Sequence, residues 1–250
     1  MRKVVLLAIA ALLVLPTFAR AEDAAEILAK TDANLNNFSN LHMTSTMTVK
    51  ASDGTAKVRE IKVWLQGDSR MVKFAKPASD VGIALLSTDS KTNFVYLPEY
   101  KKVRRVASHV RNQTFMGTDF SQEDMAILRY ADEFTPKVES ETATHWILEL
   151  TRKPGADISY AKLQLTVKKE NHTIDKIVYH DNSGVAQKTE ERANYSKHQS
   201  KKGEYWTMSK ITMTDIKTGH QTVLENSGLQ IDLTLEPDFF SERNLKRPVQ

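Results

Sequence analysis

Histidines are the residues best suited to acid–base or metal chemistry in this sequence of 250 residues, and there are seven: His42, His109, His145, His172, His180, His198 and His220. No two of them have the spacing of a metal-binding pair on one segment, such as His-x-x-x-His. The sequence also lacks a Gly-x-Ser-x-Gly elbow, a glycine-rich phosphate loop and a His-Glu-x-x-His motif. Because it has no cysteine, thiol catalysis, cysteine-bound zinc and disulfides are excluded. We therefore predict no catalytic residue, no metal and no cofactor, and a protein that is not an enzyme.

His180 and Asp181 are the best local acid–base pair. Asp181 begins the turn sequence Asp-Asn-Ser-Gly, so the pair is more typical of a strand that runs into a turn. A catalytic pair assembled from distant strands stays open, and with it a periplasmic hydrolase as the least favoured function.

A basic run covers residues 101–105, Lys-Lys-Val-Arg-Arg. In an extended chain Lys102 and Arg104 face one way and Arg105 the other, so basic groups lie on both faces. One interpretation is a basic rim, formed by Lys102, Arg104 and Arg105, that contacts anionic lipid headgroups or an acidic partner. The other is a charged edge strand that discourages aggregation. The sequence favours neither.

The segment 115–120 places three large apolar residues, Phe115, Met116 and Phe120, where a loop is expected. Gly117 permits a backbone conformation that larger residues disfavour, and Asp119 can accept backbone N–H groups at the entry of the following helix. The segment is either a lid over a cavity or a loop that plugs a closed core. Composition alone favours the plug.

Two stretches have the pattern of helices. Apolar residues in 23–35 recur at steps of three and four, which is typical of an amphipathic helix. A second helix is expected from Ser121 to about Tyr130, because Ser121 and Asp124 have the spacing of a capping box.

Nearly all the rest alternates between apolar and polar residues with period two, which predicts strands. We expect roughly ten or eleven of them, at residues 41–49, 61–65, 71–74, 83–87, 93–97, 146–150, 163–167, 177–179, 206–213, 221–225 and 229–235. The polar stretch 187–202 is interpreted as a solvated strand or hairpin. Short turns between strands predict an antiparallel sheet, and so many strands must curl or split to bury an apolar face. A strongly curved sheet with a partly open interior, a closed barrel and a two-sheet sandwich all fit.

The first 21 residues have the parts of a secretory signal: a basic start, an apolar run too short to span a membrane, and a small-residue exit at Ala19-Arg20-Ala21. We predict cleavage after Ala21, which leaves 22–250 as one domain in the periplasm. Cleavage lowers Lys plus Arg from 35 to 32 against 31 acidic residues, so the net charge falls from +4 to +1. A nucleic-acid partner is therefore not expected.

Several of these segments together resemble one family. They are Lys76–Gly82, Tyr96–Pro98, the basic run 101–105, Phe115–Ser121, Glu123-Asp124 and Phe239–Leu245. The chain, from about residue 24 to 247, is similar to the outer-membrane lipoprotein-sorting proteins of the LolA-like superfamily, in a divergent branch.

The resemblance implies a mainly β fold, an unclosed antiparallel half-barrel like LolA and LolB, lined by apolar residues and lidded by a few helices. It implies a periplasmic carrier that shields acyl chains of a lipoprotein or lipid on the way to the outer membrane, with only peripheral membrane contact. An inner-membrane exporter and an outer-membrane acceptor are its expected partners. The alternative is an accessory subunit of an inner-membrane lipid exporter, without cargo of its own.

The resemblance turns the segment 115–120 towards the lid interpretation, with lid residues Phe115, Met116, Gly117 and Phe120. The side chains expected to bind lipid lie on apolar strand faces, although a shift of one residue would invert each strand. These predicted lining residues are Met43, Met47, Val63, Leu65, Phe74, Leu148, Leu150, Leu165 and Met208.

Overall fold

The alternating segments form one sheet in the computed structural model, which describes residues 22–89, 91–127 and 129–249. The predicted signal peptide, residues 1–21, lies outside the described residues. The strands are β1 (Leu41–Lys50), β2 (Ala56–Gln66), β3 (Ser69–Lys76), β4 (Ala84–Ser87), β5 (Asn93–Leu97), β6 (Lys102–Arg105), β7 (Phe134–Glu141), β8 (His145–Arg152), β9 (Lys162–Lys168), β10 (Ile174–His180), β11 (Ala186–Ser200), β12 (Gly203–Asp215) and β13 (Gln221–Ile231). The helices are α1 (Ala24–Asn36), α2 (Gln122–Ala126), α3 (Tyr130–Glu133) and α4 (Glu242–Leu245), with short 3-10 turns η1 (Pro98–Tyr100) and η2 (Ser108–Val110).

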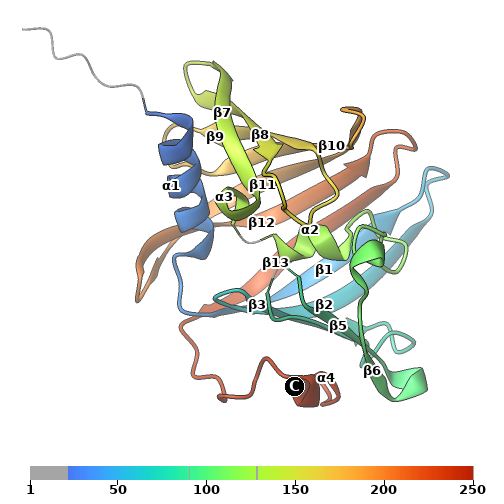
Figure 1. Ribbon diagram of the computed structural model, residues 1–250. Coiled ribbons are helices and arrows are strands. Elements are labelled where there is room, and N and C mark those ends of the chain that lie inside the picture. Colours follow the sequence, from blue (N-terminus) through green and yellow to red (C-terminus); the bar gives the residue numbers. More distant parts are fainter. Residues whose placement is uncertain (1–21, 90, 128, 250) are drawn as a thin grey trace, which may run out of the picture.

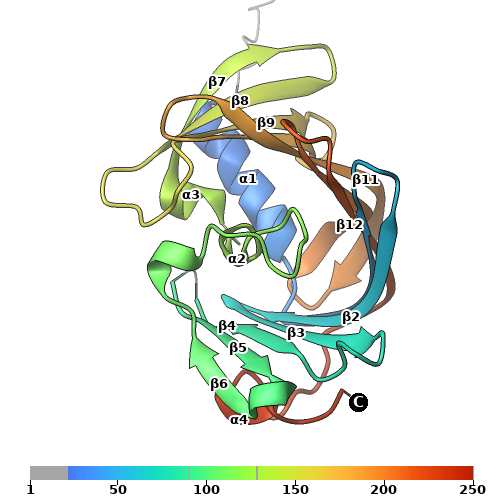
Figure 2. The ribbon, with the colours of Figure 1, turned by 90° about the vertical axis from the view of Figure 1, so that its right-hand side faces the viewer.

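The thirteen strands pair antiparallel in the order β6-β5-β4-β3-β2-β1-β13-β12-β11-β10-β9-β8-β7. Since β6 and β7 end the sheet without pairing with each other, the barrel is unclosed, and the predicted fold class is confirmed. Figure 2 shows the sheet curling around its helices as a half-barrel. A closed barrel and a two-sheet sandwich are thereby excluded.

The sheet has more strands than the ten or eleven expected. Strand β7 was missed because it is largely polar and solvent-exposed, so its alternation carries little apolar signal. The two segments expected at 221–225 and 229–235 are instead one strand, β13, and the polar stretch 187–202 belongs to the long strand β11. A strand exposed on one face needs few apolar residues, which hides it in the sequence.

Helix α1 forms where the apolar stripe predicted it and lies across the concave side of the sheet (Figures 1 and 2). Asp23 caps it by accepting the Glu26 backbone N–H at 2.8 Å. Its Ile27 and Leu28 are fully buried against strands β8 to β10. One half of the sheet is therefore filled by a helix and solidly packed.

The expected helix from Ser121 to Tyr130 is divided into α2 and α3. The capping box is present: the Ser121 N–H donates to Asp124 Oδ2 at 2.7 Å, and the Asp124 N–H donates to Ser121 Oγ at 3.1 Å. Asp32 of α1 accepts the N–H groups of Tyr130 and Ala131 at 2.9 and 2.8 Å. In a continuous helix these two N–H groups would donate to carbonyl groups four residues earlier. Because Asp32 accepts them instead, α3 begins as a separate helix.

Two segments that carry the family resemblance meet on the other half of the sheet. Gly82 has φ of +89°, and a Cβ there would lie 3.0 Å from Cγ of Pro98. Both its conformation and the close approach of Pro98 favour glycine.

The C-terminal segment with α4 packs on the convex side near β4 and β5 (Figure 1), where Leu245 is fully buried.

Candidate functional site

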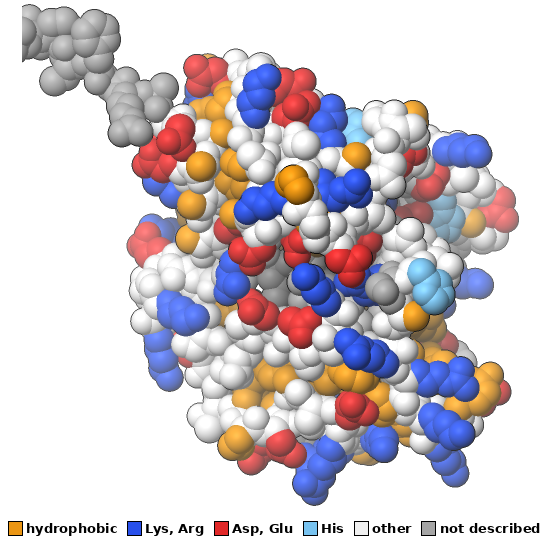
Figure 3. Space-filling model, viewed as in Figure 1, with side chains coloured by type: hydrophobic (Ala, Val, Ile, Leu, Met, Phe, Trp, Pro, Cys, Tyr) orange, Lys and Arg blue, Asp and Glu red, His pale blue; other side chains and the backbone are white. Residues whose placement is uncertain are grey.

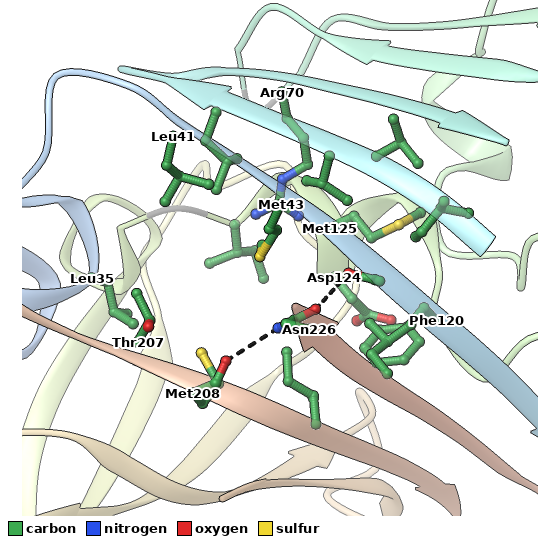
Figure 4. A pocket seen from close by; sticks show the side chains of 18 of the residues that line it. Leu35, Leu41, Met43, Arg70, Phe120, Asp124, Met125, Thr207, Met208 and Asn226 are labelled. Carbon is green, nitrogen blue, oxygen red and sulfur yellow. Dashed lines mark hydrogen bonds between the residues drawn. The ribbon is translucent and has the colours of Figure 1, made fainter. Parts of the chain in front are cut away.

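A cavity of about 200 Å³ lies on the concave side, between the half filled by α1 and the strands β1 to β4. An apolar cavity of ~150 Å³ already admits a benzene-sized molecule. Figure 4 shows side chains from several strands and α2 converging on it. Its apolar lining comprises Leu35, Phe38, Leu41, Met43, Met47, Ile61, Val63, Leu65, Val72, Phe74, Leu85, Phe115, Phe120, Met125, Ile127, Trp206, Met208, Ile211 and Leu224.

Most of the predicted lining residues are brought together here. Those that lie on the wall of this cavity are Met43, Met47, Val63, Leu65, Phe74 and Met208. Leu148, Leu150 and Leu165 do not reach it, because Ile27 and Leu28 of α1 cover their face and leave them fully buried in a packed core. The alternation gives the correct inward face for these three, but a helix fills the space in front of them.

The predicted lid lies against the cavity. Phe115 and Phe120 line it, and the ring centroids of Phe115 and Phe74 are 6.2 Å apart. Met116 packs on the same apolar cluster of β1 to β4. Gly117 has φ of +73° at an exposed tip with nothing near its Cβ position. The Phe115 N–H donates to the Phe120 carbonyl at 3.1 Å, which closes the segment into a tight loop.

Asp119 holds this loop to strand β13. The sequence predicts instead that Asp119 accepts N–H groups at the entry of the next helix, and that prediction is wrong. Its Oδ2 accepts the Thr222 hydroxyl at 2.7 Å, and its N–H donates to Thr222 Oγ1 at 2.9 Å. His220 Nδ1 lies 2.7 and 2.9 Å from the two carboxylate oxygens. The hydroxyl and the imidazole both bind the carboxylate, so this group fastens the loop and does not form a Ser-His-Asp type of relay.

Helix α2 is fixed to the half of the sheet that α1 fills. Asp124 accepts the Tyr160 hydroxyl at 2.7 Å and pairs with Lys188 Nζ at 2.5 Å. Glu123 accepts the N–H and the hydroxyl of Ser159 at 2.6 and 2.7 Å. The loop 115–120 thus extends from an anchored helix across the cavity to the opposite strands.

The predicted rim residues lie on β6, at one edge of the sheet. Lys102, Arg104 and Arg105 are exposed, and the Arg104 guanidinium lies 5.4 Å from the centroid of the Tyr100 ring. Figure 3 shows Lys and Arg side chains gathered near this end of the molecule. None of the three lines the cavity. An edge position suits both sequence interpretations, a contact surface and a charged edge.

A polar group that the sequence analysis missed lies in the cavity wall. It consists of Tyr130 and Glu190, which are buried, and Arg70 and Arg192, which are half-buried. Arg192 donates from Nε to Glu190 Oε1 at 2.6 Å and from Nη2 to the Tyr130 hydroxyl at 3.0 Å. Burial raises the pKa of Tyr130 to about 12. A sequence signal exists for Arg70, because it alternates with Val72 and Phe74 on β3 and so shares their face. No such signal marks Glu190 and Arg192, because the polar stretch around them predicts a solvated strand.

His180 ends β10, and Asp181 accepts the N–H groups of Ser183 and Val185 at 2.8 and 3.0 Å, so this pair forms a turn. Within the described residues, no group of three or more His, Asp or Glu side chains is arranged to hold a metal ion. No helix in the described part of the chain is long and apolar enough to cross a membrane.

Solved structures of an outer membrane lipoprotein-sorting protein domain and of a LolA superfamily protein have a fold similar to this half-barrel. A domain from Vibrio parahaemolyticus, described as an outer membrane lipoprotein-sorting protein, is 25% identical with a TM-score of 0.80, covering 90% of this chain and 98% of its own. A LolA superfamily protein from Nitrosomonas europaea is 21% identical with a TM-score of 0.75, covering 90% of this chain and all of its own.

A protein from Desulfovibrio piger, of a family defined by a domain of unknown function, is 22% identical with a TM-score of 0.79, covering 88% of this chain and 97% of its own. No curated protein matches the sequence. A family model described as an uncharacterized protein matches residues 66–247, most of the chain, and the protein belongs to that family. The predicted likeness to the LolA-like superfamily is confirmed.

Proposed function

We propose that the protein is a non-enzymatic periplasmic carrier that holds acyl chains of a lipoprotein or lipid in the cavity and moves them towards the outer membrane. The observation that carries this is a hollow, apolar interior in a fold shared with lipoprotein-sorting proteins. Burial of an acyl chain contributes about 0.8 kcal/mol per CH₂ group. An apolar trough is therefore sufficient for tight binding without a reactive group.

Methionines on the wall support this proposal. Met43, Met47, Met125 and Met208 line the cavity from β1, α2 and β12. Unbranched thioether side chains adapt to partners of varied shape, which suits a flexible acyl chain. The loop 115–120 over the cavity supports a lid role, because its Phe115 and Phe120 shield apolar surface that would otherwise meet water.

Two measurements test the carrier function. Native mass spectrometry of protein purified from the periplasm should find a copurifying lipid, and lipid-free protein should take up a fluorescent fatty acid. A protein that is always empty and takes up no fatty acid would contradict the proposal. Recovery of an inner-membrane exporter with such an empty protein would favour the accessory-subunit alternative.

A matched pair of variants on β2 makes the test specific to the cavity. Val63 is 8% exposed and lines the cavity, whereas Val58 is 58% exposed on the same strand. Val63→Trp should reduce fatty-acid uptake at least about tenfold by filling the hollow, at a stability cost of about 1–3 kcal/mol. Val58→Trp should bind as the wild type does. Equal uptake by Val63→Trp and wild type would place the ligand elsewhere.

A further inference from the structure

Arg70 of β3 places a positive charge in a wall that is otherwise mostly apolar. It shares a strand face with Val72 and Phe74, and Figure 4 shows its guanidinium directed into the cavity. Its Nε is shielded from solvent and has no hydrogen-bond partner, and the side chain forms no ion pair within the part of the chain that the structure describes. The cavity thus contains an uncompensated cation.

A second guanidinium, that of Arg192, has hydrogen-bond partners for only two of its three nitrogen atoms. Its side chain is 9% exposed, and its Nη1 is buried without a partner, while Nε and Nη2 bind Glu190 and Tyr130. The other oxygen of Glu190 accepts the Tyr179 hydroxyl at 2.7 Å. Glu190 therefore neutralises one of the two arginines.

The remaining carboxylate on the wall does not supply the missing charge. Asp124 is already paired with Lys188 and hydrogen-bonded to Tyr160. Burial, with a smaller effect of the Arg192 cation, lowers the pKa of Arg70 to about 10, so Arg70 is still protonated at neutral pH. Arg70 is half-buried, with its Nε shielded from solvent. A partly desolvated charge without a counter-ion is costly, and a ligand anion would relieve that cost.

From this arrangement we infer that the ligand of the cavity carries an oxyanion head group, a carboxylate or a phosphate, which pairs with the guanidinium of Arg70. The inference rests on the proposed carrier function and adds the chemical class of the ligand. A planar guanidinium matches the geometry of both oxyanions. The chain of the ligand then lies along the methionine-rich wall, and the head group is buried rather than left in water.

Three probes with the same 16-carbon chain test the inference: the fatty acid, the alkyl phosphate and the primary alcohol. Binding of each to lipid-free protein is measured by titration calorimetry, for wild type, Arg70→Leu, Arg70→Lys and Arg243→Leu. Arg243 is 77% exposed on α4 and serves as the matched loss of one charge outside the cavity. Circular dichroism and thermal unfolding establish that each variant is folded.

The wild type and Arg243→Leu should bind at least one of the two anions about tenfold or more tighter than the alcohol. Arg70→Leu should lose that preference while its affinity for the alcohol is retained, and Arg70→Lys should keep part of it. The tighter of the two anions identifies the source as a fatty acid or a phosphate-bearing lipid.

If Arg70→Leu fails to fold, the preference of Arg70→Lys for anion over alcohol is compared with that of the wild type, and this comparison still decides the test. Equal binding of anion and alcohol by the wild type overturns the inference and leaves the carrier function standing. A preference that persists in Arg70→Leu also overturns it. Failure of all three probes to bind overturns both.

Discussion

Asp32 connects the stability of the protein to pH. Asp32 is 6% exposed, and its carboxylate accepts the first two N–H groups of α3. Burial raises its pKa from 3.8 to about 6, although the two hydrogen bonds oppose this. The folded protein therefore binds the Asp32 proton more tightly than the unfolded chain does between these pH values.

A raised carboxyl pKa gives a contribution to stability that is complete below pH 4 and is lost as the pH rises through 6. We expect the free energy of unfolding of the wild type, relative to Asp32→Asn, to fall by up to about 3 kcal/mol between pH 4 and pH 7. Urea unfolding of both proteins at several pH values measures this. A difference that is constant with pH would mean that Asp32 does not titrate in this range.

The attachment of loop 115–120 to strand β13 should control access to the cavity. Asp119 is 6% exposed, and its contacts with Thr222 and His220 bind residues about a hundred positions apart in the sequence. The side chains of Phe115 and Phe120, by contrast, make apolar contacts with the wall. The polar attachment therefore sets the position of the loop over the cavity.

Thr222→Val should loosen this attachment, because it removes a hydroxyl that both donates to and accepts from Asp119. The loss of a buried hydrogen bond costs about 1–3 kcal/mol, so we expect the dissociation rate of a bound fluorescent fatty acid to rise about fivefold or more. Stopped-flow displacement measures the rate. Thr212→Val on β12 is the control, and a rate raised equally in both would contradict a specific role for the loop.

The whole molecule is divided into a solid half and a hollow half. The half beneath α1 is close-packed around Leu148, Leu150 and Leu165, whereas strands β1 to β3 face the cavity. A ligand adds to the packing only in the hollow half, and binding to the folded state alone raises stability by mass action.

Removal of bound lipid should therefore lower the Tm. A ligand at about 100 times its Kd stabilises the folded state by about 2.7 kcal/mol, which corresponds to about 5–10 °C for a chain of this size. Calorimetric scans before and after delipidation, and again after fatty acid is added back, measure this. An unchanged Tm in all three scans would contradict occupancy of the cavity by lipid.

Much of the fold could be predicted from the sequence because its signals are local. Period-two alternation gave most strands and their inward faces, including Val63 and Phe74, and the stripe of Ile27 and Leu28 gave α1. The capping box of Ser121 and Asp124 located α2. Each of these patterns depends on backbone geometry within a few residues, which the sequence specifies directly.

Only the tertiary structure decided where the interior is hollow. Val63 and Leu148 both point to the inner face of the sheet, but Val63 borders the cavity whereas Leu148 packs against α1. Alternation predicts the inward direction of both side chains and cannot show whether a cavity or a helix lies in front of them. The break between α2 and α3 depends on Asp32, and the position of the loop depends on Thr222, both distant in sequence. Arg70 and Arg192 line the same cavity from β3 and β11, which are separated in the sheet by β2, β1, β13 and β12. No pattern within a few residues of either one predicts that the curvature of the sheet brings them together.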